Sequence, residues 1–281
     1  MDLDHLKSWI GRTEVRSDLL TPRLAEAFDA MLDEEPRRYE SGDEAPLGIH
    51  WCLGNPGVRA SGLGRDGHPK REGFMPPVPL PRRMWAAGAL TFHAPLIVGL
   101  NVTRQTTIAS LELKKGRSGL LCFLELDHLY MQEGLPCVTE RQTLVYREDP
   151  KLGESPPEPA ATGDACERIV QTITPDPVLL FRYSAVTFNG HRIHYDQEYA
   201  RKVEGYPDLV VHGPLIATLL LRAAAREGRG RRIEHFAFRG LSPSFVGRPL
   251  SLATAPVGEK VEAKALSDGR VSMAAQGRFA S

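Results

Sequence analysis

Two histidines, an asparagine and an aspartate lie within ten residues, 187–196, which read TFNGHRIHYD. Three interpretations are open. His191, His194 and Asp196 could bind a metal ion, but their spacing matches no compact zinc motif, and we predict no metal site. The histidines could be structural, within the turn that Asn-Gly predicts. Alternatively, an imidazole beside a polar partner could transfer protons near neutral pH.

A second feature favours acid–base chemistry. Sixteen residues after Asp196, His212, Gly213 and Pro214 begin an apolar helical pattern. Pro214 suits a first helical turn, and the backbone N–H of Gly213 lies where a helix has unpaired donors and the positive end of its dipole. Such a donor can hold a thioester carbonyl and stabilise the enolate oxygen that forms beside it. We therefore expect a base and an oxyanion donor on adjacent elements.

The helix that follows, residues 213–227, is apolar around nearly its whole circumference, so protein should surround it. Strands are predicted after it at 232–239, 248–255, 259–266 and 270–278. A sheet curled around one central helix is the hot-dog arrangement. The first half has its own strand patterns, at 87–93, 105–114, 118–127 and 137–148, so the expected fold is α+β, a double hot dog with a central helix in each unit.

The chain divides most clearly at residues 149–165, where proline, glycine, alanine and acids predict a solvated linker. The predicted units are 1–150 and 165–281. An amphipathic helix is expected within 17–34, capped by Ser17 or Thr21, and a strand at 177–185. Residues 54–82, rich in glycine and proline, predict an irregular surface excursion. A short echo, Pro-x-x-Val-Gly at 95–99 and 243–247, hints at duplication.

Composition narrows the class of protein. Lysine plus arginine and aspartate plus glutamate each total 35, so no nucleic-acid partner is indicated. The four cysteines form neither a disulfide framework nor a zinc motif and suit a reducing compartment. The first residues do not resemble a signal peptide, and no apolar run approaches membrane-spanning length. We expect a soluble, cytoplasmic protein that does not bind a membrane.

The segment RYSAVTFNGHRIHYDQEYARKVEGYPDLVVHGPLIATLLL resembles the hydratase segment of MaoC-like proteins. Within that superfamily it is most similar to the branch of 3-hydroxyacyl-thioester dehydratases and of mesaconyl-CoA and itaconyl-CoA hydratases. LGRDGHPKREGFMPPVPLPRRMWAAGALTFHAPL, in the first half, resembles the companion unit of the same branch. The resemblance covers about residues 47–240 and implies that the second unit carries the acid–base residues while the first binds substrate and CoA.

The resemblance assigns the catalytic histidine to His194 and the amide that faces the thioester oxygen to Gly213. Asn189 stands where the family usually has a catalytic aspartate, and His191 where it has an asparagine. An asparagine can hold water but cannot take its proton. His194 should therefore transfer the proton and Asn189 position water or substrate, while His191 orients His194 or acts as the second acid or base. Asp196 could orient His194 or simply cap the next helix.

Five residues are candidates for substrate binding. Arg82 and Arg83 could bind a CoA phosphate or a free acyl carboxylate, or equally form local ion pairs. Trp85 and His93 could line the acyl tunnel, although aromatic residues beside strands more often belong to the core, and His212 is a further substrate-binding candidate. A structural role is favoured for three other histidines: His50, His68 and His128.

The resemblance implies a hydro-lyase that hydrates an α,β-unsaturated acyl-CoA, with itaconyl or mesaconyl as the expected acyl groups. A 3-hydroxyacyl-thioester dehydratase of fatty-acid synthesis is the alternative within the same chemistry. A hot-dog thioesterase or a non-catalytic acyl-CoA-binding protein would use the same scaffold. No cofactor is expected, since CoA belongs to the substrate, and a homo-oligomer is expected.

Overall fold

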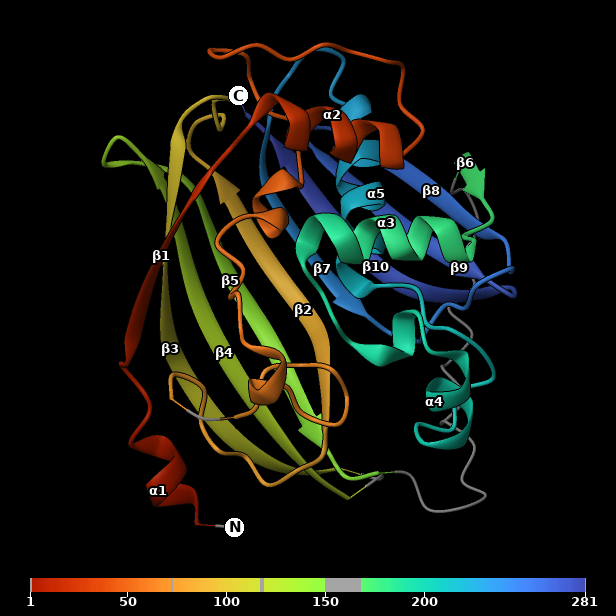
Figure 1. Cartoon of the computed structure of the whole chain (residues 1–281). Helices are drawn as coiled ribbons and strands as arrows, with labels where there is room; N and C mark the ends of the chain where they lie inside the picture. The colour runs from red at the N-terminus through yellow and green to blue at the C-terminus, as the bar shows by residue number, and fades with distance from the viewer. Residues whose placement is uncertain (1, 72, 117–118, 150–167, 281) are drawn as a thin grey trace.

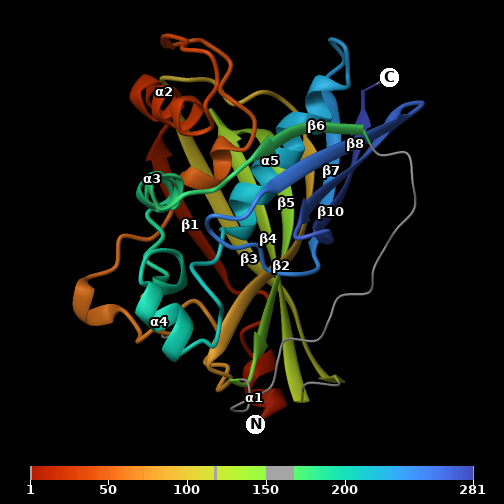
Figure 2. The ribbon, with the colours of Figure 1, turned by 90° about the vertical axis from the view of Figure 1, so that its right-hand side faces the viewer.

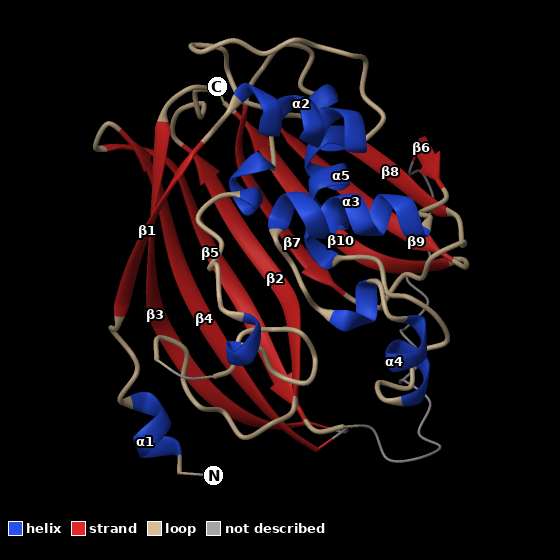
Figure 3. Cartoon of the chain, viewed as in Figure 1, coloured by secondary structure: helices blue, strands red, loops and turns tan. Residues whose placement is uncertain are grey.

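The computed structural model describes residues 2–71, 73–116, 119–149 and 168–280, and its ten strands form one antiparallel sheet (Figures 1 and 3). The strands are β1 Thr13–Leu19, β2 Arg82–Phe92, β3 Asn101–Gly116, β4 Gly119–Gln132, β5 Leu135–Arg147, β6 Arg168–Ile173, β7 Ile233–Gly240, β8 Leu250–Val257, β9 Lys260–Ser267 and β10 Arg270–Phe279. The α-helices are α1 Leu3–Lys7, α2 Pro22–Met31, α3 Pro177–Thr187, α4 Gln197–Lys202 and α5 Gly213–Arg226. Three short 3-10 turns are η1 Ile49–Cys52, η2 Ala60–Gly62 and η3 Arg192–His194.

The two halves of the chain meet where β2 pairs with β7, from Ala87 opposite Arg239 to Thr91 opposite His235. Outward from this seam the strand order is β2-β5-β4-β3-β1 on one side and β7-β10-β9-β8-β6 on the other. The halves therefore have the same topology, and Figure 2 shows the two groups of strands on either side of the seam. Asp149 is the last described residue before the gap, so the rest of the predicted linker lies outside the described residues.

The repeated Pro-x-x-Val-Gly segments occupy equivalent positions, directly after the two seam strands. The N–H of Val98 donates to the carbonyl of Asp43 at 2.9 Å, and that of Val246 to Leu209 at 3.0 Å. Each following glycine donates to a residue just after the first strand of its own half, namely Leu20 and Pro175, at 2.7 Å in both cases. The echo in the sequence thus reflects a repeated structure.

Helix α5 fills the concave face of the second half, where it contacts β7, β8, β9 and β10 (Figure 1). Nine of its residues are buried, as the apolar circumference predicted: Leu215, Ile216, Ala217, Thr218, Leu219, Leu220, Leu221, Ala223 and Ala224. In the first half the position before the seam strand is taken by η1 instead. Its His50 packs against Phe92 and Tyr130, so a short turn occupies the place of a long helix.

The eight strands predicted beside the two hot-dog cores are confirmed, with small shifts at their ends. The strand predicted at 177–185 is wrong, because these residues form α3. Asp176 caps that helix by accepting a hydrogen bond from the N–H of Leu179 at 2.7 Å, and Pro177 occupies its first turn. A short apolar run does not by itself distinguish a buried strand from a helix.

Two further differences concern the edges of the sheet. Strands β1 and β6 were not predicted, and both are largely exposed edge strands with little apolar alternation. Helix α2 begins at Pro22 with Thr21 as its cap, so Ser17 lies in β1 and caps nothing there. None of the described helices has the length and hydropathy needed to cross a bilayer.

Candidate active site

The TFNGHRIHYD segment is a compact turn between α3 and α4. Phe188 ends α3 in the left-handed conformation, and the N–H of Asn189 donates to the carbonyl of Ser184 at 2.8 Å. The side-chain oxygen of Asn189 accepts a hydrogen bond from the N–H of His191 at 3.0 Å. This is the Asx turn that Asn-Gly predicts. It leaves the amide N–H₂ group of Asn189 as the part of that side chain that can bind another oxygen.

Asp196 has a structural role at the far end of this turn. One carboxylate oxygen accepts the N–H of Tyr199 at 2.9 Å and so caps α4, and the other binds the guanidinium of Arg192 at 2.7 Å. Of the two roles open for Asp196, capping is the one that the structure supports. It is not hydrogen-bonded to His194.

His194 is buried, and its Nδ1 lies 2.7 Å from the carbonyl oxygen of Val210. A carbonyl only accepts, so Nδ1 carries the proton and Nε2 holds a lone pair. Burial lowers the pKa of His194 to about 3, against the smaller opposing effect of the hydrogen bond to Val210. At neutral pH the ring is therefore uncharged and Nε2 is ready to accept a proton.

His212 lies beneath His194 and does not face the substrate space. Its ring stacks on His194 with centroids 3.6 Å apart and is fully buried. Its Nε2 is 2.9 Å from the hydroxyl of Ser184. The prediction of His212 as a substrate-binding residue is therefore corrected: its burial places it behind the catalytic candidate, where it supports that ring.

Gly213 is the first residue of α5 and is packed closely against Trp85. A Cβ added at residue 213 would lie 3.0 Å from the Trp85 ring, so a side chain there would push the aromatic ring away. The N–H of Gly213 is one of the helix-start donors without an acceptor inside the helix. Trp85 in turn stacks on Phe238 with centroids 4.5 Å apart, which fixes it across the seam.

These groups border one large cavity of about 2100 Å³ between the two halves. Predicted residues that line it are Asn189, His191, His194, Gly213, Trp85, Arg82 and Arg83. His93 is exposed and binds the hydroxyl of Thr139 at 3.1 Å, away from this cavity. Its predicted place in the acyl tunnel is therefore wrong, because His93 is exposed just after the end of β2 and does not line the cavity.

The two arginines differ. Arg82 is buried and forms an ion pair with Glu204 at 2.9 Å, which supports the local-acid alternative for this residue. Arg83 is half-buried in the cavity wall and its charge acts on His68, His191 and Tyr146. Arg83 is thus the better placed of the two for an anionic group of a ligand.

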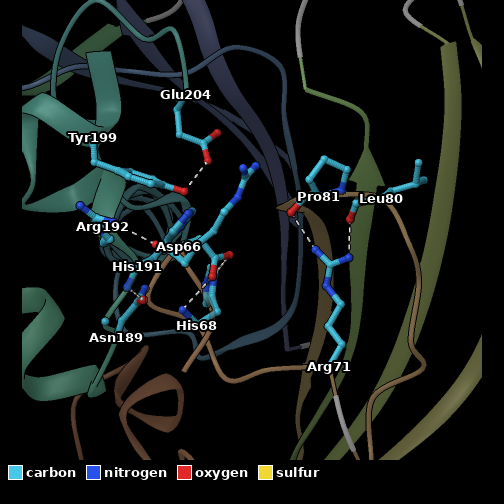
Figure 4. Close-up of polar contacts among 12 residues, drawn as sticks. Asp66, His68, Arg71, Leu80, Pro81, Asn189, His191, Arg192, Tyr199 and Glu204 are labelled. Atoms are coloured by element: carbon cyan, nitrogen blue, oxygen red, sulfur yellow. Dashed lines mark hydrogen bonds and ion pairs between the residues drawn. The ribbon is translucent and has the colours of Figure 1, made fainter. Parts of the chain in front are cut away.

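Two residues of this wall were missed by the sequence reasoning. Asp66 and His68 come from the 54–82 excursion, and His68 stacks on His191 with ring centroids 4.1 Å apart (Figure 4). Asp66 was not considered and His68 was assigned a structural role. In the sequence, an acid and a histidine two residues apart, Asp66 and His68, were the available signal for this site. The local sequence does not show that these residues contact the second half of the chain.

The chain is similar to known proteins over most of its length. Residues 48–246 match the model of the family described as hydroxyacyl-thioester dehydratase type 2. The chain belongs to this family. It is 42% identical over 271 residues to the mesaconyl-C(4)-CoA hydratase of Chloroflexus aurantiacus, with 95% of each chain covered. It is 30% identical to the mitochondrial hydroxyacyl-thioester dehydratase type 2 of Schizosaccharomyces pombe, over 75% of this chain and 78% of that one.

Solved structures of other proteins share the fold of this chain. The MaoC-like dehydratase of Phytophthora capsici superposes with a TM-score of 0.70 at 17% identity, covering 100% of this chain and 99% of that one. HtdX of Mycobacterium tuberculosis gives a TM-score of 0.68 at 19% identity, covering 96% and 100%. The expected α+β double hot dog and the MaoC-like resemblance are confirmed, and the protein is a hydro-lyase.

Proposed function

We propose that this hydro-lyase adds water across the α,β double bond of a short branched dicarboxylyl-CoA, with mesaconyl-CoA as the preferred acyl group. The observation that carries the proposal is the state of His194: one ring nitrogen is bound to Val210, and the other is left as a base beside the cavity and the start of α5. The 42% identity to a mesaconyl-C(4)-CoA hydratase favours mesaconyl over itaconyl as substrate.

In the proposed reaction the N–H of Gly213 binds the thioester oxygen, where negative charge develops as water attacks. The side-chain N–H₂ of Asn189 holds the water oxygen, since its carbonyl is engaged by His191. Nε2 of His194 takes a proton from that water while its oxygen bonds to the β carbon. The α carbon then accepts a proton, so one water is added in all. These steps use groups of the chain itself, and CoA enters as part of the substrate.

Arg83 is the proposed partner for an anionic group of the substrate, either the free carboxylate of the acyl chain or a CoA phosphate. It lines the cavity and, unlike Arg82, forms no ion pair with another described residue. We further propose that the protein acts in the cytosol and as a homo-oligomer; both stay predictions.

A substrate panel tests the proposal. Purified protein is mixed with mesaconyl-CoA, itaconyl-CoA and crotonyl-CoA, and the loss of enoyl-thioester absorbance is followed. We expect mesaconyl-CoA to give the highest kcat/KM. Higher kcat/KM for 3-hydroxybutyryl-CoA dehydration than for any dicarboxylyl-CoA would favour the dehydratase alternative, which the family match also supports. Release of free CoA would indicate a thioesterase, and binding without turnover would contradict the hydratase proposal.

A further inference from the structure

The loop that holds Asp66 and His68 is docked directly on the catalytic turn. The N–H of Arg192 donates to the carbonyl of Asp66 at 2.9 Å, and the Arg192 guanidinium donates to the carbonyl of Arg65 at 3.1 Å. Gly67, at φ +85°, lies so close to Gly190 that an added Cβ would be 1.9 Å from the Gly190 carbonyl oxygen. The first half therefore delivers His68 to the second half through a tight backbone contact.

Asp66 fixes the orientation and the protonation of His68. One carboxylate oxygen lies 2.9 Å from Nδ1 of His68, and the other accepts the backbone N–H of the same residue at 3.1 Å (Figure 4). Because an ionised carboxylate only accepts, Nδ1 donates and Nε2 is the nitrogen left for other chemistry. Burial favours the neutral acid, but hydrogen bonds from His68 and its charge hold the pKa of Asp66 well below its usual range.

His68 differs from its neighbours in having a charged partner. His194 is bound to a neutral carbonyl, and the His191 ring makes no hydrogen bond to any other residue in the described part of the chain. Burial lowers the pKa of His68 to about 4, while the carboxylate of Asp66 opposes that change. A carboxylate stabilises an imidazolium that forms beside it. Of the three rings on this wall, His68 is thus the one equipped to hold a proton.

His68 lies where it could transfer the proton that Asn189, which replaces the usual aspartate, cannot transfer. Hydration needs a proton taken from water and a proton given to the α carbon, and an asparagine can do neither. His68 lines the same cavity as His194, and its charge acts on both His191 and His194. The row of rings from His68 through His191 to His194, with centroid separations of 4.1 and 5.3 Å, joins the two sites.

We propose that His68, held by Asp66, is the second proton-transfer group of the site and exchanges the proton of the α carbon. The assignment rests on the proposed hydratase function. In hydration, His194 removes a proton from water as the C–O bond forms, and the π electrons move to the thioester oxygen. The proton then passes from His194 to Nε2 of His68, by way of His191 or water, and the imidazolium beside Asp66 gives it to the α carbon of the enolate. Both rings are then neutral again, and the balance is one water added.

The same cluster could suggest a bound cation, because donor atoms of Asp66, His68 and His191 lie within 4.8 Å of one another. Burial is the main cause that lowers the pKa values of both histidines, and the nearby charge of Arg83 contributes in the same direction. The positive guanidinium of Arg83 disfavours a bound cation at this place, whereas a proton on His68 is stabilised by the hydrogen-bonded carboxylate of Asp66. The hydrogen-bonded Asp66–His68 pair is therefore the assignment that we test.

The test compares wild type with His68→Asn, whose amide N–H can still donate to Asp66 but cannot titrate. We expect kcat for mesaconyl-CoA to fall about 10²- to 10⁴-fold with little change in KM. Imidazole added to the medium should restore part of the lost kcat, which a structural role would not explain. His235→Asn, on the outer strand surface and hydrogen-bonded to Thr91, is the matched control and should leave kcat unchanged.

If wild type is active and a folded His68→Asn variant is equally active, the assignment of His68 is overturned, but the proposed hydratase function is not. A wild type that hydrates no enoyl-CoA would overturn the proposed function and this assignment with it. Stoichiometric metal in the active protein, with activity lost on chelation, would also replace the proposal.

Asp66→Asn gives an independent reading if His68→Asn does not fold. Loss of the carboxylate lowers the pKa of His68, so the resting ring becomes protonated, and unable to accept the relayed proton, only at a lower pH. The acid limb of the kcat profile for hydration should therefore move to lower pH. An unchanged pH profile in a folded Asp66→Asn variant would contradict the proposal.

Discussion

Single hydrogen bonds decide which atoms of the site can react. The carbonyl of Val210 sets the tautomer of His194, and the carboxylate of Asp66 sets that of His68. The resemblance to MaoC-like proteins predicted His194, Asn189 and Gly213 as a group, and the turn and helix-start signals alone did not choose between the two histidines of the turn. It did not predict Asp66 and His68, because their role depends on a contact with residues more than a hundred positions away. The burial of His212 could not be predicted from the local sequence pattern either.

The first prediction at this scale concerns His194. His194→Gln keeps a side chain of similar size over His212 but removes the basic Nε2, so we expect kcat to fall by about 10³-fold or more. Stopped-flow or steady-state loss of enoyl absorbance measures the effect. Affinity for a saturated acyl-CoA, measured by calorimetry, should be nearly unchanged. Turnover close to wild type would show that another group removes the proton from water.

At the scale of elements, the site depends on two loops that press against each other. The excursion 54–82 was expected to be ordered and irregular over the surface, and its part near Gly67 forms a wall of the cavity. Helix α3 was missed because the apolar residues 177–181 are consecutive and show no helical period, although Asp176 and Pro177 supplied a helix-start signal. The strands near the seam were predictable because alternation and turns mark them clearly.

Gly67→Ala tests the docking of these loops. The new Cβ would meet the Gly190 carbonyl at 1.9 Å, and backbone atoms cannot yield as a flexible side chain would. We expect His68 to withdraw from His191 and kcat to fall at least about 10-fold, as for loss of a positioned acid. Gly73→Ala is the matched control, since Gly73 has a similar φ of +87° but open space around its Cβ position.

Both glycine variants should lose about 1 kcal/mol of stability from the left-handed backbone, and Gly67→Ala should lose more because of the contact with Gly190, as measured by urea unfolding. Only Gly67→Ala should lose activity. Equal kcat in the two variants would mean that the loop contact does not position a reacting group.

At the scale of the whole molecule, folding encloses several histidines in uncharged form. Burial lowers the pKa values of His50, His128 and His194 to about 3 and that of His68 to about 4, from 6.5. The unfolded chain therefore binds more protons than the folded chain between pH 6.5 and these values. Stability is fully present above about pH 6.5 and is lost as the pH falls.

We expect the melting temperature to fall steeply between pH 6.5 and 5, with each buried histidine contributing on the order of 1–2 kcal/mol by pH 5. Differential scanning fluorimetry from pH 8 to 5 measures this. His50→Phe should reduce the slope, because the ring lies among Trp51, Phe92 and Tyr130 and its Nε2 has no partner in the described residues. A melting temperature that stays constant from pH 7 to 5 would contradict the expectation.

The short turn η1, which stands in the first half where α5 stands in the second, has a consequence for how such an enzyme diversifies. Without a long helix on its concave face, the first half leaves β3, β4 and β5 bordering the cavity, with Arg104, Leu126, His128, Gln142 and Leu144 in its wall. Substitutions there resize or recharge the acyl pocket far from α5 and the turn at 187–196. The sheet face of β3, β4 and β5 can thus be changed to fit new acyl groups while the turn at 187–196 and the loop at 66–68 keep the proton chemistry constant.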